Sequence, residues 1–288
     1  MAIRTAVIPA AGMGTRFLPA TKAVPKELMP IFDTPAIQLV MDEAIGAGAT
    51  RIVIVTSPNK PAIEQYVKPS PEVVKRVRDT GRNELADRLE RIGKDVEVVF
   101  AMQNEPRGLG HAVSCARDQV GKEPFTLLLP DELMGGPALL QQMVEMCERE
   151  KKSVVGLKQV PMSEVSSYGV VTTTATPASN GEVTVTGVVE KPQPDESPSD
   201  LILIGRYVLM PEMFELLAGL APAASGEIQL TDALLLGANE RNVLGVVSDI
   251  ARFDTGTPLG WLKAVIEFAR QREDVAPALD AWLLSLLK

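Results

Sequence analysis

The sequence predicts an α/β protein with a mixed, mostly parallel central sheet flanked by helices. The apolar run from Ile3 to Pro9, with its β-branched residues, is typical of a buried parallel strand. A helical pattern after Thr34 and a second apolar run at 51–56 give the order strand, loop, helix, strand, which favours a parallel crossover. Strand-like runs between 168 and 190 add a small antiparallel ribbon.

The first half of the chain alternates helices and strands. Thr34-Pro35 opens a helix that ends near Gly46, where the apolar spacing stops. The segment 60–93 is charged and helical in pattern, which predicts a solvated cover. Short apolar runs bounded by turn residues then predict strands at 96–102, 125–129 and 153–160, with helices at 109–119 and 137–151 between them.

The pattern changes after residue 166. Two strand-like runs, 168–173 and 183–190, are joined by a turn through 177–181, and a flexible loop rich in Pro, Ser and acidic residues follows. The final segment carries a strong apolar stripe, so we expect residues 273–288 to be a C-terminal helix for docking or oligomerisation. The remaining expected elements are strands at 201–210 and 243–247 and helices at 211–220, 228–239, 259–270 and 277–288.

Composition limits the class of protein. The chain has 288 residues, 45% of them hydrophobic, which is enough to bury a large core. Its formal charge of −8 argues against a general nucleic-acid binder, because such a protein needs a basic surface to neutralise phosphates. Cys115 and Cys147 form no metal-ligand pattern and are expected as free thiols. No targeting segment or membrane span is visible, so a cytoplasmic location without membrane contact is expected.

The loop after the first strand is typical of a polyphosphate site. Small residues let backbone amides approach an anion, while the nearby guanidinium and ammonium groups supply positive charge. Phe17 stands where a dinucleotide fingerprint needs Gly or Ala, and no Gly-Lys-Ser/Thr follows, so neither that motif nor a Walker loop fits. The residues concerned are Ala10, Ala11, Gly12 and Gly14 in the loop, with Arg16, Lys22 and Lys26 beyond it.

A longer motif supports this interpretation. Gly12–Pro19, then Thr21-Lys22, then Pro25-Lys26-Glu27 resembles the signature of nucleotide-sugar pyrophosphorylases, and the likeness runs from about residue 4 to 270. The resemblance implies a Rossmann-like GT-A nucleotidyltransferase fold over residues 1–272, with the glycine loop closing over a nucleoside triphosphate. Within the family the motifs are most similar to those of members that use UTP and glucose 1-phosphate.

Two aspartates are candidate metal ligands. Asp131 and Asp254 each follow an apolar strand-like run, and Mg²⁺ often takes one or two carboxylates together with substrate phosphates. Taken alone, each is more simply a turn residue. Leu129-Pro130-Asp131 and Phe253–Thr257 resemble the two metal-site motifs of the family, which implies Asp131 and Asp254 as the Mg²⁺ ligands.

Further motifs resemble the base and sugar sites of the family. Gln103 with Gly108 resembles the base-reading element, whereas His111, which follows them, is expected to be structural. Glu190 and Lys191 would otherwise be explained as a surface ion pair. Tyr168-Gly169-Val170, Glu190-Lys191-Pro192 and Ile204–Tyr207 resemble the sugar-phosphate side, which implies binding by Gly169, Glu190, Lys191 and Gly205.

The resemblance implies an enzyme that forms UDP-glucose and pyrophosphate by in-line attack on the α-phosphorus of UTP. Arg16 and Lys26 would then hold the departing pyrophosphate, and Lys191 would hold the attacking phosphate. The open alternatives are a thymidylyltransferase that uses dTTP, a non-catalytic nucleotide-sugar-binding regulatory protein, and a dinucleotide-dependent dehydrogenase, which Phe17 weakens. A homo-oligomer, either dimer or tetramer, is expected.

Overall fold

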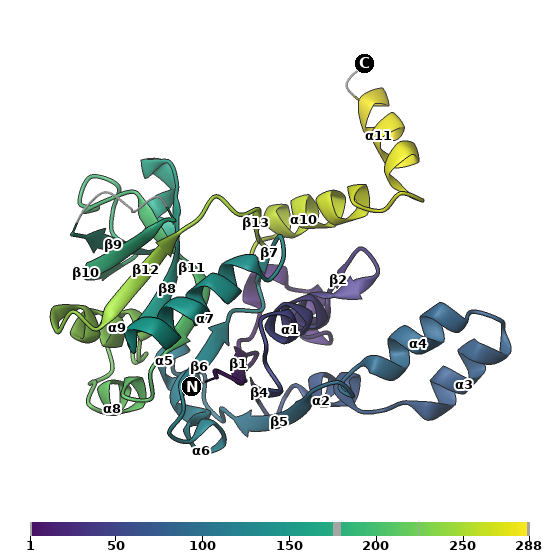
Figure 1. The fold of residues 1–288 in the computed structure, drawn as a ribbon. Coiled ribbons are helices and arrows are strands. Elements are labelled where there is room, and N and C mark those ends of the chain that lie inside the picture. Colours follow the sequence, from purple (N-terminus) through teal and green to yellow (C-terminus); the bar gives the residue numbers. More distant parts are fainter. Residues whose placement is uncertain (1, 175–179, 224, 287–288) are drawn as a thin grey trace.

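The computed structural model of the chain describes residues 2–174, 180–223 and 225–286. Its centre is a nine-stranded sheet with the order β5-β4-β1-β6-β11-β8-β12-β10-β9 (Figure 1). The strands are β1 (Thr5–Pro9), β4 (Arg51–Thr56), β5 (Glu97–Met102), β6 (Phe125–Leu128), β8 (Ser153–Gln159), β9 (Gly169–Thr173), β10 (Glu182–Glu190), β11 (Leu201–Leu209) and β12 (Val243–Val247).

The strand directions confirm the mixed, mostly parallel sheet. Strands β5, β4, β1 and β6 are parallel to one another, β11 runs antiparallel between β6 and β8, and β12 is again parallel to β8. The antiparallel ribbon is β9 with β10. Ile202 of β11 also pairs with Val170 of β9, so this half of the sheet curls back on itself. Of the predicted turn at 177–181, residues 177–179 lie outside the described residues.

Helices cover both faces of the sheet because its central strands are buried on both sides. One buried cluster joins the sheet to α1, α7 and α10, and the other joins it to α5, α8 and α9. These helices are α1 (Ala36–Gly46), α7 (Ala138–Glu150), α10 (Pro258–Arg270), α5 (Leu109–Cys115), α8 (Met213–Ala218) and α9 (Leu230–Asn239).

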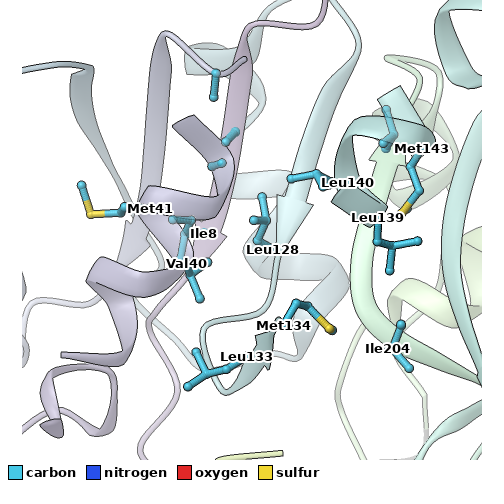
Figure 2. Packing of buried hydrophobic residues seen from close by; sticks show 14 of the residues in the cluster. Ile8, Val40, Met41, Leu128, Leu133, Met134, Leu139, Leu140, Met143 and Ile204 are labelled. Atoms are coloured by element: carbon cyan, nitrogen blue, oxygen red, sulfur yellow. The ribbon is translucent and has the colours of Figure 1, made fainter. Parts of the chain in front are cut away.

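Figure 2 shows part of the first cluster, with side chains of α1 and α7 against the sheet. Ile8 of β1, Val40 of α1 and Leu128 of β6 have no exposed surface. Leu140 of α7 and Ile204 of β11 are equally buried. Burying each such side chain contributes about 1.5–3 kcal/mol. This packing fixes the strands whose ends carry the loops of the predicted site.

Two segments are more divided than the sequence indicated. The helix predicted at 109–119 is interrupted at Ala116, which separates α5 from α6 (Arg117–Val120). The charged cover at 60–93 consists of three helices, and its last two form a hairpin that projects from the body (Figure 1). These three are α2 (Pro61–Val67), α3 (Pro71–Asp79) and α4 (Asn83–Arg91).

Two small sheets were not predicted. Strand β2 (Pro30–Ile31) pairs with β3 (Thr34–Pro35), where a helix start was expected. Strand β7 (Glu132–Met134) pairs antiparallel with β13 (Arg252–Asp254). Two-residue and three-residue strands are too short to give a periodic signal in sequence. The second pairing matters for the site because it brings together segments that are far apart in the chain.

The C-terminal helix is present as α11 (Ala276–Ser285), and it extends away from the sheet beyond α10 (Figure 1). None of its described residues is buried, and Trp282 and Leu284 expose 56% and 62% of their surface. The division at residue 272 and the docking or oligomerisation role stay predictions. Residues 287–288 of the predicted helix lie outside the described residues.

The structure bears on two expectations from composition, the free cysteines and the lack of a membrane span. Cys115 and Cys147 are free, as predicted. Burial raises the pKa of the Cys147 thiol to about 11, which keeps it protonated and inert at neutral pH. Within the ranges that the structure describes, no helix combines the length and the apolar character needed to cross a bilayer.

Candidate active site

The loops that follow β1, β5 and β6 meet at one edge of the sheet. Because these strands are parallel, their carboxyl ends point the same way, and ligands of open α/β sheets bind beyond such ends. Two adjoining cavities lie there, with volumes of about 250 Å³ and 420 Å³. Leu109, Leu129 and Asp131 line both cavities. Asp131 therefore lies at the junction of the two.

The larger cavity collects the residues predicted to bind the nucleotide. Ala11, Gly12 and Gly14 of the first loop line it, together with Lys26, Gln103 and Gly108. Ala10 is placed differently, since it is fully buried beneath the loop. Its amide donates to the carbonyl oxygen of Val55 (2.7 Å), and its own carbonyl oxygen accepts from Lys60 Nζ (2.9 Å). Both polar groups of Ala10 are thus used inside the protein.

The smaller cavity collects the residues predicted to bind the sugar phosphate. Gly169, Glu190, Lys191 and Gly205 all line it. Lys191 Nζ lies 3.0 Å from Glu190 Oε1, which is the ion pair that the simpler interpretation of these two residues expects. The Lys191 side chain remains 55% exposed, so it is free to reach a ligand in the cavity.

Arg16 and Lys26 line different cavities, although the sequence motif assigns both to the same phosphates. It lines the smaller cavity with Asp254, and its Nη1 donates to the carbonyl oxygen of Gly256 at 3.4 Å. Its positive charge also contributes to the field at Asp131. Arg16 and Lys26 therefore approach Asp131 from the two cavities.

The structure brings Asp131 and Asp254 to the same space. Strand β13 pairs with β7 so that Asp254 faces Glu132, the residue after Asp131. The amide of Thr255 donates to the carbonyl oxygen of Asp131 at 2.7 Å. A Cβ atom placed on Gly256 would lie 3.0 Å from Asp254 Oδ1 and 3.3 Å from Asp131 Oδ2. One small volume is therefore in contact with both carboxylates.

Each aspartate is held by a separate set of partners. The Tyr168 hydroxyl donates to Asp254 Oδ2 (2.9 Å), and the amide of Gly256 donates to Oδ1 (2.9 Å). The Arg252 guanidinium stacks on the Tyr168 ring at 4.5 Å and forms an ion pair with Glu132. Burial raises the pKa of Glu132 despite this pairing. Tyr168 is thus oriented by a cation on one side and by Asp254 on the other.

Asp131 forms an ion pair with Lys26, whose Nζ lies 2.5 Å from Oδ2. Burial opposes the charged form of each group, but the mutual attraction prevails, so the pKa of Asp131 is lowered and the pKa of Lys26 is raised. Both side chains are charged at neutral pH. The junction of the cavities therefore carries an anionic carboxylate with a cation beside it.

The donor set fits a hard divalent cation. Asp131 and Asp254 offer carboxylate oxygens, and Mg²⁺ is commonly held by one or two carboxylates together with phosphates of the substrate. In the described part of the chain, no group of three or more His, Cys, Asp or Glu side chains is arranged as a complete metal cage. A metal at this place would therefore need oxygens from a ligand as well.

A buried arginine that the sequence-based site lacks holds the loop around Asp131. Arg206 of β11 has no exposed surface, and its Nε and Nη2 bind the Glu43 carboxylate of α1 at 2.8 Å and 2.7 Å. Its remaining donors reach the carbonyl oxygens of Leu129 (3.2 Å) and Glu132 (2.7 Å). Both ends of the loop that carries Asp131 are thus fixed by one guanidinium.

A second buried ion pair supports the first loop. Lys60 Nζ, besides binding Ala10, lies 2.8 Å and 3.0 Å from the Glu27 carboxylate oxygens. Burial lowers the pKa of Lys60 and raises that of Glu27, and the attraction between the two opposes both effects. The pair ties the glycine loop to the turn that presents Lys26. Arg206 is a charged residue within the apolar run 201–210. Because buried charges need partners, such a residue is the sequence signal that could have indicated a buried ion pair.

Gln103 and Gly108 form a unit at the far end of the larger cavity. The Gln103 Nε2 donates to the carbonyl oxygen of Gly108 at 3.2 Å. Gly108 has φ of +90°, and a Cβ there would lie 2.7 Å from the carbonyl oxygen of Ile228. Only glycine fits this place without strain, since other residues rarely adopt such a φ. Gly205 has φ of +62°, and a Cβ there would lie 3.0–3.1 Å from side-chain atoms of Leu129 and Glu132, so glycine is favoured at this position too.

A protein-family match identifies the class of protein to which this chain belongs. The family model described as nucleotidyl transferase matches residues 5–271 of this chain. The chain belongs to the nucleotidyl transferase family. Proteins of this family typically use a divalent metal ion.

Individual relatives narrow the class. The chain is 39% identical to the UTP–glucose-1-phosphate uridylyltransferase of Bacillus subtilis (strain 168) over 286 residues, which covers 99% of this chain and 97% of the relative. It is similar to a UTP-bound UGPase from Acinetobacter baumannii, with a TM-score of 0.90, 34% identity and coverage of 99% of each chain. It is also similar to a UDP-glucose pyrophosphorylase complexed with UDP-glucose, with a TM-score of 0.85, 34% identity and coverage of 94% and 100%.

Proposed function

We propose that this chain is a UTP–glucose-1-phosphate uridylyltransferase, which forms UDP-glucose and pyrophosphate from UTP and glucose 1-phosphate. The observation that carries the proposal is the pair of cavities that adjoin at Asp131. One contains the glycine loop and the Gln103–Gly108 unit, and the other contains Gly169, Glu190 and Lys191. Two anionic substrates bound in these cavities would meet at the residue that both share.

The nucleotide fits the larger cavity. Apart from the exposed Met13, the glycine loop consists of small residues, so the amides of Ala11, Gly12 and Gly14 can approach the triphosphate closely. Lys26 and Arg16 flank Asp131 and supply positive charge to the phosphates that depart as pyrophosphate. Gln103 and Gly108 offer polar groups to the uracil edge, while Ala10 supports the loop from beneath through its buried contacts.

The sugar phosphate fits the smaller cavity. Glu190 can accept hydrogen bonds from vicinal hydroxyl groups of glucose, and Lys191 can hold its phosphate. Gly169 and Gly205 line the cavity without side chains, and Gly169 packs so closely that a Cβ there would lie 2.9 Å from side chains of both Leu203 and Thr231. The ion pair between Glu190 and Lys191 keeps the two groups next to each other.

The reaction needs positioning and charge neutralisation more than proton transfer. An ionised oxygen of glucose 1-phosphate forms a bond to the α-phosphorus of UTP, and the bond to the bridging oxygen breaks, so that pyrophosphate leaves with the electron pair. No general base is required, which fits the engagement of His111 with Gln103 outside the junction. Arg16, Lys26 and Lys191 reduce the repulsion between the two anions and align the attack.

We further propose that Asp131 and Asp254 hold Mg²⁺. Bound there together with substrate phosphates, the ion would neutralise negative charge on the phosphates during transfer. The support is the small volume that both carboxylates contact, with Arg16 Nη1 beside it, and the oxygen ligands that the two carboxylates offer. The Tyr168 hydroxyl and the Lys26 ammonium keep the carboxylates in place in the absence of the ion.

Pyrophosphate release, measured over a panel of nucleoside triphosphates and sugar 1-phosphates with and without Mg²⁺, tests the proposal. We expect release with UTP and glucose 1-phosphate, at least about tenfold faster than with ATP, GTP or CTP, and loss of release after chelation of divalent ions. A clear preference for dTTP would indicate a thymidylyltransferase instead. Binding of UTP without any pyrophosphate release would indicate the non-catalytic alternative.

A further inference from the structure

His111 lies behind the Gln103–Gly108 unit and has a contact that the reaction does not use. It is the single histidine of the sequence. Its Nδ1 lies 3.0 Å from the Nε2 of Gln103, and its Nε2 lies 3.8 Å from the thiol sulfur of Cys115. Both ring nitrogens thus face partners inside the protein. The first contact is to Gln103, which is only 5% exposed and lines the larger cavity.

The orientation of the Gln103 amide follows from its contact with the carbonyl oxygen of Gly108. The carbonyl oxygen of Gly108 can only accept a hydrogen bond, so the group 3.2 Å from it must be the amide nitrogen of Gln103. The same nitrogen faces His111 Nδ1, so Nδ1 accepts a hydrogen bond from the second N–H of the Gln103 amide. The ring proton of neutral His111 is then on Nε2, directed toward Cys115. Two acceptors hold the nitrogen end of the amide.

The oxygen end of the amide is left for a ligand. Among the described residues, none donates a hydrogen bond to Gln103 Oε1. Yet Oε1 is not one of the buried side-chain oxygens in the described ranges that lack a partner, so this atom is accessible from the cavity. The cavity therefore presents a hydrogen-bond acceptor at this place. Buried sites of this kind discriminate strongly, because a mismatched ligand leaves polar groups unpaired.

An acceptor at this place distinguishes pyrimidines. N3 of uracil and of thymine carries a hydrogen and donates, whereas N3 of cytosine is an acceptor and would oppose Oε1. A freely rotating Gln could turn its Nε2 toward cytosine, but that would place Oε1 against the carbonyl oxygen of Gly108 and against His111 Nδ1. The Gly108 carbonyl oxygen always opposes this turn, and His111 opposes it while its ring proton is on Nε2, on the side of Cys115.

We propose that His111 is a specificity-determining positioning residue, which selects uracil over cytosine by holding the Gln103 amide with its oxygen toward the base. The inference rests on the proposed uridylyl transfer, in that it takes the larger cavity as the nucleotide site. His111 does not touch the base itself. Its effect passes through Gln103, so it acts on the choice of nucleotide and leaves the junction at Asp131 unchanged.

The test compares kcat/KM for UTP, CTP and dTTP in three variants. His111→Phe keeps a ring but removes the acceptor, and we expect the ratio of UTP to CTP to fall about tenfold, which corresponds to the loss of one buried hydrogen bond. The ratio of UTP to dTTP should not change, because thymine has the same N3 donor. His111→Asn, whose Oδ1 can replace Nδ1 as acceptor, should restore most of the preference for UTP over CTP.

Cys115→Ala is the matched control, since it removes the partner of the other ring nitrogen. We expect it to leave the UTP to CTP ratio within twofold of the wild type. An unchanged ratio in His111→Phe would overturn the proposal, and so would an equal fall in His111→Asn. If the phenylalanine variant does not fold, His111→Leu provides the same loss of acceptor in a smaller side chain.

Calorimetric binding of UTP and CTP without sugar phosphate separates this inference from the proposed function. Loss of discrimination in binding by His111→Phe supports the inference even where the chain forms no UDP-glucose. Turnover of UTP with unaltered discrimination in the variant supports the proposed function and contradicts the role of His111.

Discussion

Asp131→Asn is expected to lower kcat for UDP-glucose formation by about 10²–10³-fold while the fold stays intact. The change keeps the shape of the side chain but removes its negative charge at the junction of the two cavities. It weakens the proposed metal site and breaks the ion pair with Lys26. Initial rates at saturating UTP and glucose 1-phosphate, together with circular dichroism, measure both effects.

The control for this prediction is Asp118→Asn on α6, an exposed aspartate away from both cavities. Its kcat should remain that of the wild type. A kcat for Asp131→Asn within tenfold of the wild type would show that the carboxylate at the junction does not carry the charge of the reaction. Comparison of the rates over a range of Mg²⁺ concentrations then shows whether the variant needs more metal.

Glu43→Ala is expected to lower the free energy of unfolding by about 3–5 kcal/mol. Arg206 would keep its buried position, yet its guanidinium would lose the carboxylate that binds its Nε and Nη2. An uncompensated charge in a dry interior is one of the most destabilising changes that a single substitution makes. Urea unfolding followed by circular dichroism measures the change.

The matched control is Glu145→Ala on α7, where the glutamate is exposed. It should change the free energy of unfolding by no more than about 0.5 kcal/mol. Glu43→Gln keeps hydrogen-bonding atoms beside Arg206 and should fall between the two. A Glu43→Ala variant as stable as the wild type would mean that Arg206 finds other partners, and that the loop at Leu129–Glu132 does not depend on this pair.

The sheet could be predicted from sequence because its strands are long apolar runs separated by turn residues. The runs at 51–56, 96–102 and 125–129 correspond to β4, β5 and β6 with shifts of one residue at most. Parallel direction followed from the helices between them. Because the loops after these strands follow parallel strands, their convergence at one sheet edge can be predicted from the sequence, and with it the placement of Gln103 beside the glycine loop.

The finer structure of the site could not be predicted because it depends on contacts between distant residues. Arg252 and Glu132 are 120 positions apart, and their strands have three residues each, so nothing local indicates that β7 and β13 pair. The buried pair of Arg206 on β11 with Glu43 on α1 joins residues that are 163 positions apart. The use of both backbone groups of Ala10 inside the protein likewise appears only in three dimensions.

The roles of the predicted site residues stay predictions of different strength. Gly108 and Gly205 are needed for their backbone conformations whatever the ligand is. Glu190 and Lys191 form the ion pair that a purely structural explanation also expects, so their assignment depends on the cavity they line. His111, expected to be structural, contacts the residue that is proposed to read the base.

The central claim is that Asp131 and Asp254, brought together by the pairing of β7 with β13, hold one divalent cation between the two substrates. A crystal grown with UDP-glucose and Mn²⁺ tests it most directly, because manganese can be located by its anomalous scattering. We predict a single anomalous peak in bonding contact with both carboxylates and with phosphate oxygens of the product. A product-bound crystal whose metal peak touches neither Asp131 nor Asp254 would contradict the claim.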